Sequence, residues 1–191
     1  QVTNSSTPQA PLYFRLEKNL MTEILNNHPD WQGKQLYGVL GIKNNTVDLM
    51  FSNVEPNAGK TMGSGEFYDF SRPCPPTCDD TQANTHEGSD SLSSQEFLQR
   101  YTDYILLFQN SIVTSNFFQN SGIESVPLYF RLHENLLLSI LNDHPNWQGE
   151  EVYAVMGLHG DNIDLLFSNV EPNVGKGIFD GEFYDFSRPC P

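Results

Sequence analysis

Residues 11–33 read PLYFRLEKNLMTEILNNHPDWQG, and residues 127–149 read PLYFRLHENLLLSILNDHPNWQG. The match continues without a gap over 11–75 and 127–191 at a constant offset of 116 (127 − 11), and 41 of the 65 aligned positions are identical. Both segments end in GEFYDFSRPCP. A match of this length identifies an internal duplication, which has to be recognised before any single element is assigned. We expect a repeating unit of 116 residues, of which the chain holds one copy and the first part of another.

Positions that differ between the two copies separate the expected core from the expected surface. Leu36 becomes Val152 and Met50 becomes Leu166, and packed interior positions tolerate such exchanges of one apolar residue for another. The change at residue 34, from Lys to Glu in the second copy, is tolerated only where water solvates either side chain. The first group is therefore predicted to be buried and the second to be exposed.

The charge of the chain is strongly negative and uneven. The formal charge is −14, from 24 acidic and 10 basic residues. Segment 11–75 sums to −1 (six basic, seven acidic), segment 76–126 to −6 (one basic, seven acidic) and segment 127–191 to −7 (three basic, ten acidic). This balance makes nucleic acid and anionic membrane surfaces poor partners, and neither is predicted. No apolar run approaches the roughly 18 residues of a membrane span, so none is predicted.

Each copy is predicted to contain one helix followed by three antiparallel strands. Apolar residues recur three and four positions apart after Pro11, which predicts an amphipathic helix over 11–27 and another over 127–143. Apolar runs of β-forming residues on either side of short Asn- and Gly-containing turns predict hairpins. The strands are expected at 35–42, 47–54 and 66–70 in the first copy and at 151–158, 163–170 and 182–186 in the second.

Between the two copies lies a segment of different character. Residues 76–92 are polar and predict a linker. Residues 93–118 open with a capping-box pattern from Ser93 to Glu96 and carry one apolar stripe, which predicts a second kind of amphipathic helix. Residues 119–126 are read as a second linker.

The predicted fold class is α+β. It consists of two copies of a helix plus antiparallel β-meander module, at 11–75 and 127–191, packed as a pseudo-symmetric tandem with the extra helix. Residues 1–10 form an N-terminal extension. A module of about 65 residues buries too little apolar surface to be stable alone. Each copy is therefore expected to depend on the other copy or on the segment between them.

The cysteines leave one thiol without a partner by arithmetic. Cys74 and Cys78 lie four residues apart in the first copy, whereas Cys190 has no such neighbour. Three alternatives follow: the native chain continues past Pro191 and supplies a partner, Cys190 pairs with one of the other two, or it bonds to another chain. The spacing does not choose between them.

Two N-x-S/T sequons indicate an extracellular chain. They place candidate glycosylation sites at Asn4 and Asn44. The chain also begins QVTNSST rather than with Met, as a mature secreted protein does after signal removal. Secretion is therefore the expected localisation.

A repeated polar segment raises the question of a cation site. NVEPNAGK at 53–60 recurs as NVEPNVGK at 169–176, with alternating oxygen-bearing side chains of the kind calcium prefers. The EF-hand pattern fails, because glycine falls at the seventh position instead of the sixth. A turn is the favoured interpretation, and no metal or other cofactor is predicted. The weak calcium candidates are Asn53, Glu55, Asn57, Asn169, Glu171 and Asn173.

Aromatic residues offer a candidate ligand site in each copy. Trp31 with Tyr68, and Trp147 with Tyr184, could stack on a sugar or another small ligand. Catalytic motifs such as G-x-S-x-G and H-E-x-x-H are absent from the sequence. No catalytic residue is predicted.

These observations predict a secreted, acidic, non-enzymatic tandem-repeat protein with a structural, adhesive or self-assembling role in a matrix, fibre or oligomer. The expected partners are further copies of the chain, with a glycan or a cation as other possibilities. One alternative is an extracellular carbohydrate- or small-ligand-binding module with one site per repeat. Another is an extracellular hydrolase using Glu66, Asp69 and His28 or their counterparts.

Overall fold

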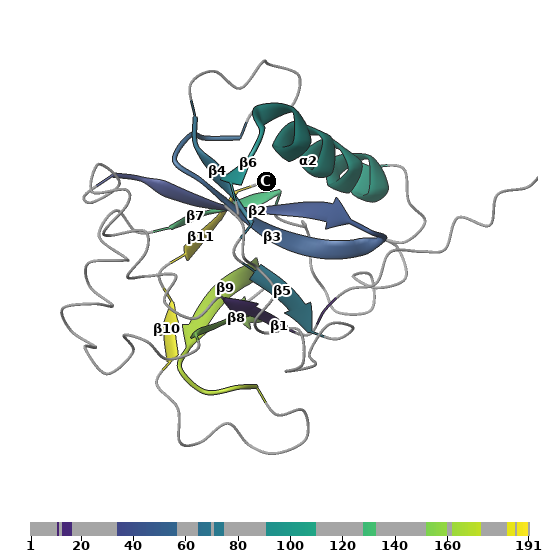
Figure 1. Ribbon diagram of the computed structural model, residues 1–191. Coiled ribbons are helices and arrows are strands. Elements are labelled where there is room, and N and C mark those ends of the chain that lie inside the picture. The colour runs from purple at the N-terminus through teal and green to yellow at the C-terminus, as the bar shows by residue number, and fades with distance from the viewer. Residues whose placement is uncertain are drawn as a thin grey trace, which may run out of the picture.

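Two antiparallel sheets and one helix make up the described part of the chain (Figure 1). Most of these residues are in strands, so the protein is a mixed, roughly α+β structure. The computed structural model describes residues 11, 13–16, 34–56, 65–69, 71–74, 91–109, 128–132, 152–159, 162–172, 183–185 and 187–190.

The larger sheet has six strands in the order β11-β7-β2-β3-β4-β6. Its centre is the hairpin of β2 and β3, in which Lys43 pairs with Thr46 across the turn. Asn44 and Asn45 form that turn with φ of 50° and 62°, a conformation that asparagine tolerates better than most residues. The bounds are β2 Leu36–Lys43, β3 Thr46–Ser52, β4 Phe67–Tyr68, β6 Ser91–Leu92, β7 Tyr129–Leu132 and β11 Ser187–Cys190.

The smaller sheet has five strands in the order β10-β9-β8-β1-β5. The β8–β9 hairpin corresponds to β2–β3 at the offset of 116 residues, and its pairing register is the same. The bounds are β1 Tyr13–Leu16, β5 Ser71–Cys74, β8 Val152–His159, β9 Asn162–Ser168 and β10 Phe183–Asp185.

Both sheets combine strands from the two copies of the duplicated sequence. In the smaller sheet β1 pairs with β8, which places Tyr13 opposite Val155. In the larger sheet β7 pairs with β2, which places Tyr129 opposite Val39. These two pairings are equivalent, because 13 + 116 = 129 and 39 + 116 = 155. Strands at the beginning and end of each copy therefore lie in the sheet that contains the other copy's hairpin.

The predicted helices at 11–27 and 127–143 are wrong at YFRL, which forms a strand in both places. Side chains of Phe14 and Leu16 both enter the core, with 0% and 1% exposed. Strand β1 is hydrogen-bonded on both sides, to β5 and to β8, so tertiary pairing overrides the local helical spacing. Residues 17–27 and 133–143 lie outside the described residues.

Strands occur close to each of the other predicted positions. The structure has β2 and β3 where 35–42 and 47–54 are predicted, and β8 and β9 where 151–158 and 163–170 are predicted. Only two residues of the predicted 66–70 strand are in β4, and three of 182–186 are in β10. Strands β5, β6 and β11 were not predicted. Of these, β6 lies inside the predicted linker 76–92 and pairs with β4.

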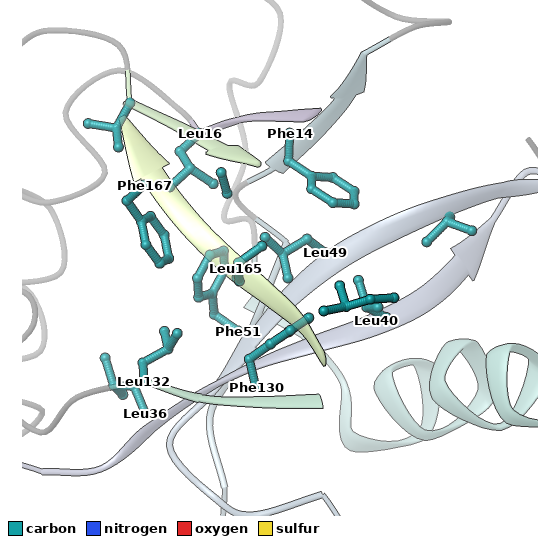
Figure 2. Packing of buried hydrophobic residues seen from close by; sticks show 14 of the residues in the cluster. Phe14, Leu16, Leu36, Leu40, Leu49, Phe51, Phe130, Leu132, Leu165 and Phe167 are labelled. Carbon is teal, nitrogen blue, oxygen red and sulfur yellow. The ribbon is translucent and has the colours of Figure 1, made fainter. Parts of the chain in front are cut away.

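The main core lies between the two sheets and draws on both copies (Figure 2). Phe14 and Phe130, at matched positions, are both fully buried. Leu49 and Leu165, also matched, are likewise buried in this layer. Because matched side chains of both copies share one core, neither copy encloses this core alone.

Helix α2, Ser94–Gln109, covers the outer face of the larger sheet (Figure 1). Its first turn is capped by Ser93, whose Oγ accepts a hydrogen bond from Glu96 N–H at 3.2 Å. The predicted helix 93–118 continues beyond Gln109 into residues that are not described. Within the described residues, no helix has the length and apolar character needed to cross a membrane.

A second core joins α2 to the sheet beneath it. Phe97 stacks against Phe67 with ring centroids 4.4 Å apart. Buried residues of both β2 and β3 point into this layer, which explains why all seven residues of β3 are buried. The members of the second core are Tyr37, Val39, Met50, Phe67, Phe97, Tyr101 and Ile105.

Candidate functional site

A cluster of charged side chains lies between α2 and the larger sheet. Arg100 of α2 is at its centre, and its Nη1 donates to Oδ2 of Asp69 at 2.8 Å and to Oδ2 of Asp48 at 3.3 Å. Its Nη2 donates to Oε1 of Glu96, one turn earlier in the helix, at 2.6 Å. Lys43 Nζ donates to the same Asp69 oxygen at 2.5 Å. We refer to Lys43, Asp48, Asp69, Glu96 and Arg100 as the carboxylate–arginine cluster.

Burial differs strongly within the cluster. The side chains of Asp48 and Asp69 are 1% and 8% exposed, and that of Arg100 is 11% exposed. Lys43 and Glu96 are 38% and 51% exposed. The two aspartates and the arginine therefore form the inner part of the cluster, with Lys43 and Glu96 at its solvent side.

The backbone of the sheet brings Arg100 close to the aspartates. Asp48 lies on β3, and Asp69 lies where the chain leaves β4 for β5 in the other sheet. Gly41 on β2 faces the helix: a Cβ there would lie 3.0 Å from the Arg100 Cβ and 2.6 Å from the Met50 methyl carbon. The absence of a side chain at Gly41 thus lets the stem of Arg100 lie against the strand.

Burial and, second to it, the neighbouring Asp69 carboxyl raise the pKa of Asp48 to about 7. Lys43 and Arg100 act in the opposite direction, as does the hydroxyl of Ser71, which donates to Asp48 Oδ1 at 3.2 Å. Near neutral pH the Asp48 carboxyl therefore changes between its neutral and charged forms. The titration occurs within a largely buried ion network.

The chemistry of the cluster suits a pH-sensitive attachment of the helix to the sheet. It holds three acidic and two basic side chains, so a proton on Asp48 balances its formal charge. Asp69 Oδ1 is buried and has no hydrogen-bond partner among the described residues. Arg100 and Lys43 both pair with the other oxygen of Asp69, Oδ2. Arg100 also pairs with Asp48, so both aspartates are engaged in ion pairs.

The second copy repeats the sheet side of this arrangement. Asp164, at the position of Asp48, is 6% exposed. Ser187 Oγ accepts from Leu165 N–H at 2.9 Å, as Ser71 Oγ accepts from Leu49 N–H at 3.3 Å. Among the described residues, no helix equivalent to α2 brings an arginine to Asp164.

A second constellation connects the two copies through tyrosine and glutamate. Tyr13 Oη donates to Glu171 Oε1 at 2.5 Å, and Tyr129 Oη donates to Glu55 Oε1 at 2.8 Å. The offset of 116 residues relates the two bonds, since 13 + 116 = 129 and 55 + 116 = 171. We call these two contacts the Tyr–Glu contacts. Arg131 Nη2 also lies 3.6 Å from Glu55 Oε1.

Aromatic pairs accompany the Tyr–Glu contacts. The rings of Tyr13 and Tyr153 meet edge to face, with centroids 5.9 Å apart and planes at 72°. Tyr37 and Tyr129 make the equivalent contact at 5.9 Å and 66°. Each contact joins a residue of one copy to a residue of the other, so both copies supply half of each pair.

The described calcium candidates have other partners in the structure. Glu55 and Glu171 accept from the tyrosines of the opposite copy. Asn53 Oδ1 accepts from the backbone N–H of Glu66 at 2.9 Å and so braces the loop before β4. Across the described ranges, no three His, Cys, Asp or Glu side chains gather in a group suited to a metal ion. Asn169 is half-buried after β9, and Asn57 and Asn173 lie outside the described residues.

The candidate aromatic ligand sites are described only in part. Tyr68 on β4 is half-buried and packs against the main core. For Tyr184 only the backbone, in β10, is described. Trp31 and Trp147 lie outside the described residues. The grouping of each tryptophan with a tyrosine stays a prediction.

The remaining predicted residues fall at strand ends, in a turn or outside the description. Cys74 ends β5 and Cys190 ends β11, in different sheets. Asn44 is exposed at the tip of the β2–β3 turn, in a position open to modification. Cys78 and Asn4 are not described, and the cysteine pairing stays open.

Sequence reasoning missed the carboxylate–arginine cluster, although two signals pointed toward it. Asp48 and Asp164 interrupt otherwise apolar strands at matched positions. Arg100 is the single basic residue of segment 76–126 and lies on a helix with an apolar stripe. A buried carboxylate in a strand requires a partner, and such a lone arginine is a candidate for it.

Comparison with known proteins finds no similarity: no family model, no curated protein and no solved structure matches the chain. The functional argument therefore depends on the geometry of the described residues.

Proposed function

We propose that this is a secreted structural protein, without enzymatic activity, that assembles with further copies of itself by exchanging strands between repeats. The observation that carries the proposal is the reciprocal pairing of β1 with β8 and of β7 with β2. Such a pairing depends on the two strands and not on the covalent connection between them. A repeat of a second chain can therefore supply the same strand, which is the principle of domain swapping.

Energetics support a strong mutual dependence of the copies. Phe14 and Leu16 of β1 are buried among residues of both copies. Burial of each such side chain is worth about 1.5–3 kcal/mol. Two of them amount to a large part of the roughly 5–15 kcal/mol by which a domain is stable. A copy without a partner loses this contribution and is expected to obtain it from another chain.

The Tyr–Glu contacts supply specificity to the proposed exchange. Both partners are identical in the two copies, so a contact between chains uses the same donor and acceptor as the contact within one chain. Each hydrogen bond contributes about 0.5–1.5 kcal/mol, which favours one register over its alternatives. We propose that these contacts align exchanged repeats.

The expected extracellular setting is part of the same proposal. Asn44 is exposed in its turn and is available to a glycan. An odd number of cysteines, with Cys190 at the end of an edge strand, supports a disulfide between neighbouring chains. Such a bond would make an exchanged assembly permanent.

Light scattering coupled to size-exclusion chromatography tests the proposal on the full chain. The chain is unfolded, refolded at several concentrations and then measured with and without reductant. We expect dimers and larger species whose fraction rises with the concentration during refolding, because exchange competes with pairing inside one chain. A monomer under every refolding condition would refute self-assembly.

A matched variant separates strand exchange from simple surface association. Leu106, at 48% exposed, is an exposed apolar side chain on α2. Leu106→Lys should leave the refolding-dependent species unchanged if strands are exchanged. Loss of these species in the variant would show that α2, and not the strands, joins the chains.

A further inference from the structure

The shortest contact of the carboxylate–arginine cluster joins a lysine amine to an aspartate carboxyl. Nζ of Lys43, the last residue of β2, lies 2.5 Å from Oδ2 of Asp69. The two residues are 26 positions apart in the sequence, so only the fold brings them together. Reacting atoms in a productive arrangement lie about 3–3.5 Å apart, and the carboxyl carbon of Asp69 is one C–O bond beyond Oδ2. The fold therefore holds together the two groups from which an amide bond is made.

The carboxyl side of this contact is shielded from water. The side chains of Asp69 and Arg100 are 8% and 11% exposed. Oδ1 of Asp69 is buried and has no hydrogen-bond partner among the described residues. Lys43 reaches the carboxyl from the solvent side, with 38% of its side chain exposed. Bulk water is thus kept from the carboxyl, whereas a water molecule released there can leave along the lysine.

Asp48 and Arg100 supply two further functions that amide formation needs. Arg100 Nη1 donates to Oδ2 of both aspartates, at 2.8 Å for Asp69 and 3.3 Å for Asp48, so the two carboxyls lie beside each other. The pKa of Asp48 is raised to about 7, chiefly by burial, so this carboxyl can accept and donate a proton near neutral pH. Arg100 lies where negative charge develops on the Asp69 oxygen when an amine adds to the carboxyl carbon.

We propose that Lys43 and Asp69 form a covalent amide bond, an isopeptide bond, in the folded chain. Nζ attacks the carboxyl carbon of Asp69, an N–C bond forms and one C–O bond of the carboxyl breaks. Of the three protons on the ammonium, one stays on the amide nitrogen, and two leave with the carboxyl oxygen as water after transfer through Asp48. No group is oxidised or reduced, and no co-reactant is needed. One positive and one negative charge disappear together, so the net charge of the cluster does not change.

The duplication predicts one such bond per chain. Both aspartates have counterparts in the second copy, Asp164 and Asp185, but His159 takes the place of the lysine and has no primary amine. In the first copy the bond ties the end of β2 to the point where the chain passes from β4 in the larger sheet to β5 in the smaller one. It closes a loop of the chain and so constrains the unfolded state, as a disulfide does. Both residues belong to one copy, so the inference does not depend on strand exchange.

Intact mass spectrometry of the full chain tests this inference. The chain is produced without glycans, incubated in its folded state at neutral pH, and then reduced and denatured. We expect a mass one water molecule below that of the sequence, and one branched proteolytic peptide that contains residues 43 and 69. A chain that keeps its full mass after prolonged incubation would mean that the contact is only an ion pair, which overturns the inference. Loss of water at another place, such as a cyclised aspartate at Asp180–Gly181, also overturns it.

Variants identify the two reacting groups, with circular dichroism to verify that each variant folds. Lys43→Arg keeps the positive charge but has no amine that can form this bond, and it should keep its full mass. Asp69→Asn offers a carboxamide, so the same bond should release ammonia instead of water. Asp48→Asn transfers no proton and should form the bond at least tenfold more slowly than Asp103→Asn, a substitution on α2 outside the cluster. Loss of water that persists in Lys43→Arg would overturn the bond, and equal rates in the two Asp→Asn variants would overturn the role of Asp48.

Discussion

Replacement of Asp48 by Asn should remove a large part of the pH dependence of stability. The pKa of Asp48 rises in the folded protein from an ordinary value of 3.8 to about 7, chiefly because the carboxyl is buried and secondarily because Asp69 is near. Between these values the folded state holds a proton that the unfolded state has released. Asp48 therefore contributes stability that is complete below pH 3.8 and is lost as the pH rises to 7.

The magnitude follows from the two pKa values. Each pKa step is worth about 1.4 kcal/mol, so a rise from 3.8 to about 7 corresponds to about 4 kcal/mol. The free energy of unfolding of the unmodified chain should fall by about this amount relative to Asp48→Asn between pH 3.5 and pH 8. Asparagine stays neutral throughout and keeps an oxygen that can accept from Arg100.

Urea denaturation followed by far-ultraviolet circular dichroism, at half-unit pH intervals, measures both profiles. The informative quantity is the difference between the two chains at each pH, because other acidic groups titrate in both. Asp103→Asn is the matched control, since Asp103 lies on the same helix and accepts from Gln99 at 2.9 Å outside the cluster. A difference profile that is flat from pH 4 to pH 8 would refute the argument that burial holds the proton on Asp48.

Four further substitutions test the packing of α2, of the two glycine positions and of the shared core, with free energies of unfolding measured by urea titration. Arg100→Met leaves two buried aspartates without their guanidinium and should cost about 3–5 kcal/mol at pH 7; a loss below 1 kcal/mol would contradict the role given to this ion network. Gly41→Ala forces the new methyl group against Arg100 and Met50 and should lower the free energy of unfolding by about 1–3 kcal/mol. Gly157→Ala meets the side chain of Leu166 and should cost less. The opposite order would be inconsistent with the observed packing. Phe14→Ala should cost about 3–5 kcal/mol, and a value typical of exposed sites would show that β1 is not part of the core.

Local sequence signals anticipate the elements whose structure depends on nearby residues. Asparagine at 44 and 45 between two apolar runs indicates a hairpin turn, and both residues adopt the positive φ that such a turn requires. The Ser93–Glu96 pattern indicates a helix start, and Ser93 caps α2. Both features depend on residues a few positions apart, which is the range over which sequence patterns are reliable.

The strand at YFRL and the carboxylate–arginine cluster depend on contacts that are distant in sequence. Tyr13 and Leu16 fit a helical spacing, yet pairing with β5 and β8 decides the conformation. The pKa of Asp48 rises to about 7 because the folded chain buries its carboxyl and brings Asp69 near it, whereas Arg100, 52 residues later, opposes that rise. The sequence of β3 alone shows neither that the Asp48 carboxyl is buried nor that Arg100 is its partner.

By itself, the sequence determined that segments 11–75 and 127–191 match, where the first hairpin turns and where α2 begins. Only the tertiary structure decided that the first and last strands of each copy lie in the sheet that holds the other copy's hairpin. The physical reason is that PLYFRL and SRPC are identical in both copies, so pairing within a copy and pairing between copies bring together nearly the same side chains. Such a choice is made by how the whole chain packs, because local side-chain preferences are almost equal for both arrangements.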